Sequence, residues 1–249
     1  MSLREQTGAR LNLEGISVNF GGVAALSNIH LEVFDGQVTG LIGPNGAGKT
    51  TMFNVISGLQ KPDRGSVALG DKNVTRFGPA RRARLGLART FQRLELFGSL
   101  SSRENVEVAL ETKHGGGDLT AEGLLHRVGV TSDADRQVST LPTGEARLVE
   151  LARALAINPK LICLDEPCSG LDDSETRLLG ELLRELASEG RGVLIVEHDM
   201  DLVLRICDRI YVLDFGEIIA VGTPEEIRND PVVQSAYLGT VAPEESAER

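Results

Sequence analysis

Short runs of apolar residues predict strands in both outer thirds of the chain. In the N-terminal third, apolar and polar residues alternate through LNLEGISVNF, ALSNIHLEVF and GQVTGLIG, and glycine-containing breaks separate these segments. In the C-terminal third the apolar runs are LICL, VLIV and IYVL, with helical segments between them. Short buried strands spaced by helices are typical of a parallel sheet covered on both faces, so the pattern predicts an α/β fold.

The middle of the chain has a helical pattern instead. From about Ala80 to Ile157 we expect three or four helical segments, one of which begins at a capping box formed by Ser101 and Glu104. The loose stretch KHGGGD interrupts this region. We interpret the region as a helical lobe inserted between the two groups of strands.

Two further helices are predicted in the C-terminal third. The segment SETRLLGELLRELASE has helical spacing, and its leucines are expected to form one apolar stripe: Leu178, Leu179, Leu182, Leu183 and Leu186. The residues TPEE, beginning at Thr223, combine a capping box with a proline at the first helical position. After this helix, the ending PEESAER is predicted to be an acidic tail.

Composition and charge narrow the class of protein. A chain of 249 residues that is 41% hydrophobic is long enough for one large α/β unit with a smaller lobe. The formal net charge of -10 makes nucleic acid an unlikely main partner, because it repels polyanions at long range. The start MSLREQTGAR lacks an apolar signal region, and the longest apolar runs are too short to cross a bilayer. We therefore expect a soluble, uncleaved chain.

The cysteines indicate a reducing compartment. Cys163, Cys168 and Cys207 form no C-x-x-C pair, and their odd number argues against a disulfide framework. Cys163 lies in an apolar, strand-like run, where a small core residue is a better interpretation than a redox thiol. We expect a cytoplasmic protein and assign the cysteines no role.

The stretch GPNGAGKT, Gly43 to Thr50, predicts a phosphate-binding loop. It fits G-x-x-x-x-G-K-[ST], follows the predicted strand GQVTGLI and precedes the helical run KTTMFNVISGL. In such a loop, backbone N–H groups close around phosphate oxygens and the helix N-terminus adds its positive dipole end. We expect Lys49 to reach the β and γ phosphates and the Thr50 hydroxyl to bind Mg²⁺. An ordinary glycine-rich turn is the alternative.

Two acidic residues, Asp165 and Glu166, follow the apolar run in LICLDEP and form a second candidate site. The four apolar residues predict a central strand that carries Asp165 to its carboxyl end, where ligands bind in sheets of this kind. Asp165 is expected to hold Mg²⁺, directly or through water. The adjacent Glu166 is well placed as the general base for an attacking water, and a solvated loop acid is the alternative.

The stretch LPTGEARLVELARAL predicts a second anion site. Its apolar residues leave the first turn, Thr143 to Glu145, free to face solvent. An exposed helix N-terminus with a glycine and a hydroxyl favours anions, and we infer that it contacts nucleotide held by another copy. A helix capped by Thr143, with Glu145 compensating the dipole, explains this segment equally well.

Together these stretches resemble the ATP-binding cassette (ABC) ATPases over essentially the whole chain. GPNGAGKT is similar to the Walker A motif of that family, and LICLDEP to its Walker B motif. RTFQRLELF resembles the Q-loop with Gln92, SGLD the D-loop, and VEHDM the segment with the switch histidine, His198. LPTGEARLVELARAL occupies the position of the signature motif.

The resemblance implies a single ABC ATPase domain over residues 1–249. It implies a RecA-like core at about 9–90 and 158–240, with a mainly parallel sheet and an N-terminal antiparallel β subdomain. A helical subdomain is implied at about 91–157, and an acidic tail at 241–249. The resemblance also implies a head-to-tail dimer, in which each ATP lies between the Walker A motif of one protomer and the signature helix of the other.

The roles of individual residues are carried over from this resemblance. Those expected to contact ATP are Phe20, Gly43, Pro44, Asn45, Gly46, Ala47, Gly48, Lys49, Thr50, Thr51, Thr143, Gly144 and Glu145. Those expected to act in hydrolysis are Lys49, Gln92, Glu166 and His198. Those expected at Mg²⁺ are Thr50, Gln92 and Asp165.

Three of these residues have simpler alternatives. Phe20, the implied adenine-stacking aromatic, fits a core phenylalanine about as well from the sequence alone. His198 follows the strand VLIV, where its imidazole can hydrogen-bond a γ-phosphate, although a histidine after a strand is more often structural. Gln92, taken alone, is one polar residue in a loop.

Within the family, three segments resemble the larger ATPase subunit of branched-chain amino-acid importers: ARTFQRLELF, VLIVEHDMDLV and GTPEEIRNDPVVQSAYLG. The signature departs from the family pattern, because Pro142 removes a hydroxyl and a backbone donor and Glu145 adds a negative charge near a γ-phosphate site. Slow or partner-dependent hydrolysis is therefore expected.

The resemblance implies partners as well as chemistry. It implies ATP hydrolysis that drives solute import, with transmembrane permease subunits, a second copy or a sister ATPase, and indirectly a solute-binding protein. The cassette would lie on the inner face of the cell membrane. The apolar residues of LELFGSL fit a docking groove for a permease helix and fit core packing equally well.

Two other functions stay open at this point. One is an ATPase for lipid or lipopolysaccharide export, which uses similar compact subunits. The other is a soluble ABC protein that assembles iron–sulphur proteins or acts on ribosomes or DNA. The single Walker A motif and the acidic composition disfavour the second.

Overall fold

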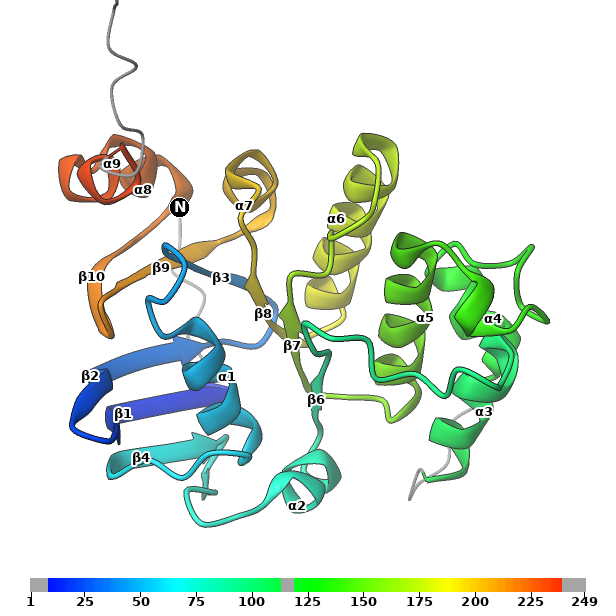
Figure 1. Cartoon of the computed structure of the whole chain (residues 1–249), viewed down its shortest axis with the longest axis horizontal. Helices are drawn as coiled ribbons and strands as arrows, with labels where there is room; N and C mark the ends of the chain where they lie inside the picture. Colours follow the sequence, from blue (N-terminus) through cyan, green and yellow to red (C-terminus); the bar gives the residue numbers. More distant parts are fainter. Residues whose placement is uncertain (1–8, 113–118, 239–249) are drawn as a thin grey trace, which may run out of the picture.

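Two sheets and a separate group of helices make up the protein (Figure 1). The computed structural model describes residues 9–112 and 119–238. The stretch KHGGGD and the predicted acidic tail at 241–249 lie outside the described residues.

The smaller sheet is antiparallel and is built from the N-terminal part of the chain. Its strand order is β2-β1-β4-β5. The bounds are β1 (Leu11–Phe20), β2 (Val23–Val33), β4 (Arg64–Leu69) and β5 (Lys72–Asn73). In β1, Leu11 and Leu13 are fully buried while Asn12 is half-buried, so the alternation places one face of the strand in the core.

The larger sheet has the order β10-β9-β3-β8-β7-β6, and only the β9–β10 pair is antiparallel. The bounds are β3 (Val38–Ile42), β6 (Leu87–Arg89), β7 (Leu161–Asp165), β8 (Gly192–Val196), β9 (Arg209–Asp214) and β10 (Glu217–Gly222). Every residue of β3, β7 and β8 is buried, as expected for strands covered on both faces. The apolar runs LICL, VLIV and IYVL therefore form strands as predicted.

Three helices stand apart from the sheets and pack against one another at one end of the molecule (Figure 1). They are α3 (Ser102–Glu111), α4 (Ala121–Arg127) and α5 (Thr143–Ala156), with a short 3₁₀ turn, η1 (Val138–Thr140), before α5. The predicted capping box at Ser101 and Glu104 starts α3. These helices lie between β6 and β7 in the chain, as the predicted inserted lobe does. The predicted start near Ala80 is wrong, because Leu87–Arg89 forms a strand of the larger sheet.

The remaining helices do not belong to this group of three. They are α1 (Lys49–Ser57), α2 (Pro79–Arg84), α6 (Asp173–Ser188), α7 (Met200–Ile206), α8 (Pro224–Asn229) and α9 (Pro231–Leu238). The capping box and first-turn proline at Thr223 start α8 as predicted. Within the described part of the chain, no helix has both the length and the apolar character that crossing a bilayer requires.

One residue of the predicted stripe on α6 lies off the buried face. Leu179, Leu182, Leu183 and Leu186 are buried, but Leu178 is 57% exposed. Residues four apart drift by about 40° around an α-helix, so the row from Leu186 back to Leu178 slants away from the core. The prediction that Leu178 joins the stripe is wrong for this reason.

A buried arginine, Arg82, forms hydrogen bonds to backbone carbonyl groups at the C-terminal end of α1. The Arg82 guanidinium, from α2, donates to the carbonyl oxygens of Val55 and Ile56, both at 2.6 Å, and to that of Phe77 at 3.0 Å. The bonds to Val55 and Ile56 supply donors for carbonyls at the C-terminus of α1, where Val55 also accepts the backbone N–H of Gly58 at 3.2 Å. Burial lowers the pKa of Arg82 to about 10, so the side chain stays charged at neutral pH.

We expect Arg82→Ala to lower the free energy of unfolding by about 2–4 kcal/mol, because buried carbonyl groups lose their donors. Urea denaturation measures this change. Arg84→Ala, on the exposed side of the same helix, is the matched control and should change stability by less than about 0.5 kcal/mol. Equal effects of the two substitutions would contradict the capping role.

Candidate functional site

The phosphate-binding loop joins β3 to α1. Its glycines take conformations that other residues rarely adopt, with φ of 82° at Gly46 and 110° at Gly48. A Cβ atom at Gly48 would lie 2.7 Å from the carbonyl oxygen of Ala25, so the position has no room for a side chain. The predicted strand, loop and helix thus follow one another as the motif requires.

Lys49 lies across its own loop. Its Nζ donates to the carbonyl oxygens of Gly43 at 2.6 Å and Pro44 at 2.9 Å. Burial lowers the pKa of Lys49, and the carboxylates of Glu166 and Asp165 oppose that shift. The lysine is therefore oriented toward the inside of the loop, while the neighbouring Thr50 is exposed.

Asp165 and Glu166 stand at the carboxyl end of β7, next to the end of β8. Asp165 is buried, and burial raises its pKa while the Arg89 guanidinium, 3.4 Å away, opposes the rise. Glu166 adopts a left-handed backbone with φ of 50°, which is uncommon for a non-glycine residue. Its Oε1 lies 2.9 Å from Nε2 of His198, the residue after Glu197 at the end of β8. The fold brings these three predicted residues to one edge.

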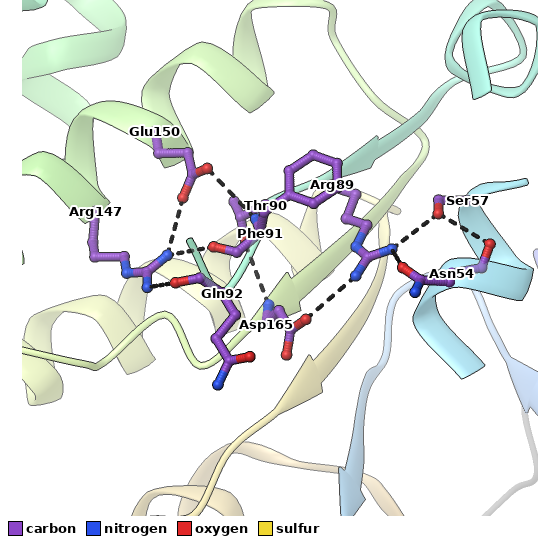
Figure 2. A network of polar contacts seen from close by, with 9 residues as sticks. All are labelled: Asn54, Ser57, Arg89, Thr90, Phe91, Gln92, Arg147, Glu150 and Asp165. Atoms are coloured by element: carbon purple, nitrogen blue, oxygen red, sulfur yellow. Dashed lines mark hydrogen bonds and ion pairs between the residues drawn. The ribbon is translucent and has the colours of Figure 1, made fainter. Parts of the chain in front are cut away.

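Gln92 lies on the segment that leaves β6 for the helical lobe. Its backbone carbonyl accepts a hydrogen bond from Arg147 on α5, and its side chain is exposed. In Figure 2 the Gln92 amide makes no bond to the other residues drawn, whereas the Asp165 carboxylate is joined to Arg89.

The first turn of α5 is not capped in the way that one of the two sequence interpretations expects. Pro142 is the residue before the first helical residue, Thr143, and no side chain caps the turn. The interpretation of Thr143 as the helix cap is therefore wrong. Thr143 is exposed, but Gly144 is buried, and a Cβ atom there would lie 2.6 Å from the carbonyl oxygen of Gly170. This turn packs on the SGLD segment.

The Glu145 carboxylate is turned toward acidic neighbours in its own chain. Its Oε2 is buried without a hydrogen-bond partner. Burial, followed by the charge of Asp133, raises the pKa of Glu145, and Glu175 adds to the rise while Arg136 opposes it. The charge expected near a γ-phosphate is thus held beside other carboxylates of the protomer.

Phe20 ends β1 and is 52% exposed. The alternative of a core phenylalanine is therefore wrong. Gly21 and Gly22, both at positive φ, form the turn that follows it.

Sequence reasoning missed a buried polar network behind these residues (Figure 2). Arg89 donates to Asn54 Oδ1 at 2.8 Å and Ser57 Oγ at 3.0 Å, both on α1, besides contacting Asp165. Arg147 and Glu150 on α5 pair at 3.3 Å and are both buried. Two features of the sequence could have indicated this network. Arg89 is a charged residue at the end of the strand LAR, and Arg147 and Glu150 lie on an otherwise apolar helix face.

A second missed carboxylate joins two loops. Glu197 is buried and accepts hydrogen bonds from the backbone N–H groups of Cys168 at 2.8 Å and His198 at 3.1 Å. It links the segment after Glu166 to the segment of the histidine. The sequence signal was a charged residue directly after four apolar ones.

Comparison with protein families agrees with this arrangement. The profile of the ABC transporter family matches residues 26–169, which include the phosphate loop, Gln92 and Asp165. The chain belongs to the ABC transporter ATP-binding family. It is an ATP-binding cassette and, like that family, an ATPase. A second profile, that of the branched-chain amino acid ATP-binding cassette transporter, matches residues 217–243 of the cassette.

Two curated relatives are similar over most of the cassette. The high-affinity branched-chain amino acid transport ATP-binding protein LivG of Escherichia coli K12 is 41% identical over 92% of this chain and 97% of its own. The lipopolysaccharide export system ATP-binding protein LptB of Acidithiobacillus ferridurans is 40% identical over 85% of this chain and 89% of its own.

Two solved structures have the same fold as the cassette. The ADP conformation of MJ1267, an ATP-binding cassette of an ABC transporter, matches with a TM-score of 0.83 and 34% identity, over 94% of this chain and 100% of its own. The dimeric structure of MJ0796, a bacterial ABC transporter cassette, matches with a TM-score of 0.77 and 28% identity, over 86% and 98%.

We expect Glu145→Gln to raise the melting temperature at pH 8 and to change it little near pH 4. Because the folded pKa is raised, the carboxylate costs stability as the pH rises from the unfolded pKa of about 4.3 through the folded value. Calorimetric scans across this range measure the difference. Glu107→Gln, at an exposed site on α3, is the control, and an equal gain there would contradict the explanation.

Proposed function

We propose that the cassette hydrolyses MgATP to drive import of branched-chain or related amino acids through separate transmembrane permease subunits. Two findings support this substrate class: the C-terminal match to the branched-chain amino acid profile and the 41% identity to LivG. The ATPase activity belongs to the family, and the direction and the solute are our proposal.

The phosphate loop and the adjacent side chains supply the nucleotide site. We assign phosphate binding to the backbone from Gly43 to Thr51 and to the ammonium of Lys49. Phe20, exposed at the end of β1, is proposed to stack on the adenine ring.

Oxygen atoms near the loop suit magnesium. Among the described residues, no three His, Cys, Asp or Glu side chains gather into a metal site, so the ion needs oxygen atoms of the nucleotide as well. The Thr50 hydroxyl, the Gln92 amide and the Asp165 carboxylate are hard oxygen donors of the kind that Mg²⁺ prefers. When bound, the ion would neutralise charge on the β and γ phosphates.

The contact between Glu166 and His198 carries the catalytic part of the proposal. At 2.9 Å, the imidazole and the carboxylate are close enough to orient each other beside the buried Lys49. We assign Glu166 as the general base that takes a proton from the attacking water. We assign His198 to the γ-phosphate, where the imidazole can donate a hydrogen bond and detect its loss.

A second protomer would complete the site. The exposed Thr143, with Gly144 and Glu145, is proposed to face nucleotide held by another copy or by a sister ATPase in a head-to-tail dimer. The dimeric MJ0796 structure supports a dimer for this kind of cassette. Because Glu145 is turned toward Asp133, Thr143 and the backbone are left to make the contact.

The segment around Gln92 is the proposed permease contact. Phe97 is 50% exposed, with the Arg153 guanidinium 5.8 Å from its ring centroid, whereas Leu96 packs against the core. We propose that Leu94 and Phe97 contact a transmembrane subunit, so that the cassette lies on the cytoplasmic face of the membrane. A solute-binding protein would act indirectly, through the permease, and nucleic acid has no part.

The 40% identity to LptB favours a second candidate, an ATPase for lipopolysaccharide export. The match of residues 217–243 of this chain to the branched-chain amino acid profile is the observation that favours amino-acid transport over this candidate. A soluble assembly ATPase is the third candidate, and no relative reported above supports it.

We expect Glu166→Gln to bind ATP, to lower kcat by a factor of about 100 or more and to accumulate a closed dimer. Single-turnover kinetics and gel filtration with ATP measure these effects. Lys49→Ala is the contrast, because it should weaken ATP binding itself by calorimetry. Near-normal turnover in Glu166→Gln would remove Glu166 as the base.

We expect the wild-type cassette, coexpressed with its permease subunits, to restore leucine uptake in a cell lacking its own importer. Glu166→Gln should restore none, because transport needs hydrolysis. Membrane fractionation of the same cells is the second measurement. Uptake of no amino acid, together with copurification with lipid-export subunits, would decide for the second candidate.

A further inference from the structure

A buried ion pair on α5, formed by Arg147 and Glu150, is hydrogen-bonded to the backbone around Gln92 (Figure 2). Arg147 donates to the carbonyl oxygens of Phe91 and Gln92. Glu150, one helical turn later, lies 3.5 Å from the backbone nitrogen of Phe91 and 3.4 Å from that of Glu95, whose N–H groups it accepts. The two side chains also pair with each other at 3.3 Å.

The bonds from the pair to residues 91–95 go to backbone atoms only. Their effect therefore depends on Arg147 and Glu150 and not on which residues occupy positions 91 to 95. The side chains of the pair are 7% and 2% exposed, so water competes little for these bonds. A bidentate guanidinium holds two carbonyl groups in a fixed orientation, which a single ammonium cannot do.

The same segment is anchored to the nucleotide-binding core at its other end. Arg89 lies three residues before Gln92 and contacts Asp165 as well as Asn54 and Ser57 of the phosphate-loop helix. Thr90 Oγ1 accepts the backbone N–H of Asp165 at 3.2 Å. Residues 89–95 therefore connect the core to α5 through polar bonds at both ends.

Apolar packing and polar bonds both join α5 to the core. Leu151 and Leu155 of α5 belong to one buried apolar cluster with residues of β7 and α6. A small cavity lies beside the pair, lined by Thr90, Arg147, Glu150, Pro167 and Leu179, among others. At this place the pair supplies the direct bonds between α5 and residues 91–95.

We propose that Arg147 and Glu150 are positioning residues that make the Gln92 segment and the signature helix move as one body. The proposal rests on the proposed function for the role of Gln92 at the metal. A shift of the first turn of α5 then displaces the backbone of Gln92 with it, and the amide of Gln92 reaches or leaves the metal site accordingly. Without Arg147 and Glu150, the Gln92 segment no longer moves together with α5.

The test compares Arg147→Met with the wild-type protein in three measurements. The first is amide hydrogen exchange at residues 91–95, which should become about tenfold faster while exchange in β7 stays unchanged. The second is ATPase activity, where kcat should fall about tenfold or more and the Mg²⁺ concentration for half-maximal activity should rise. The third is ATP affinity without hydrolysis, which should stay within about twofold because the phosphate loop is untouched.

Two companion variants make the result specific. Arg103→Met removes a half-buried arginine of the same lobe, which pairs with Asp135 at 2.8 Å and has no hydrogen bond to residues 91–95. It should change none of the three measurements. Arg147→Lys keeps the charge but cannot donate to both carbonyl oxygens in the fixed geometry of a guanidinium. It should therefore change amide exchange and the Mg²⁺ requirement in the same direction as Arg147→Met, by a smaller factor. If Arg147→Met does not fold, Arg147→Lys decides.

Unchanged exchange at residues 91–95 in a folded Arg147 variant would overturn the proposal, as would unchanged kcat and Mg²⁺ requirement despite faster exchange. Gln92→Ala distinguishes the metal role of Gln92 from the positioning role of Arg147 and Glu150. If that variant keeps the normal Mg²⁺ requirement, the metal role of Gln92 in the proposed function is wrong, whereas the exchange data still decide whether the pair holds the segment.

Discussion

Parallel pairing of β3, β8 and β7 is the constraint on which the site depends. Leu41 pairs with Val196, and Val196 pairs with Asp165, so the three strands end at the same edge of the sheet. The residues that follow them are the phosphate loop, Glu166 and His198. A helix between each pair of strands is what allows the parallel order, and the buried strands hold the edge rigid.

Burying charge at that edge requires a partner for each charged group. Lys49 is held by two carbonyl oxygens, Asp165 by Arg89, and Glu197 by two backbone N–H groups. An unpaired buried charge costs several kcal/mol, so these partners offset part of that cost and hold the groups in place at the site. Glu145 is the exception, since its buried oxygen has no partner and its nearest charged neighbours are mostly acidic.

The helical lobe differs from the core in how it is connected. Its own apolar residues pack on α5, but the segment from β6 reaches it through hydrogen bonds to Arg147 and Glu150. Apolar residues of α5 also pack in one buried cluster with residues of β7 and α6. The lobe is thus joined to the core by apolar packing through α5 and by polar bonds through the Gln92 segment.

The sequence by itself determined the order of strands and helices, the phosphate loop and the residues at the strand ends, because periodicity, caps and glycine positions are local properties. The chain order also placed Asp165 at the end of its strand and Glu166 and His198 after theirs. Only the tertiary structure decided the partners: that Glu166 contacts His198, that Arg89 lies on Asp165, that Leu178 faces solvent and that Glu145 faces Asp133. These are contacts between distant segments, whose formation depends on how the strands and helices pack, and local patterns carry no information about that packing.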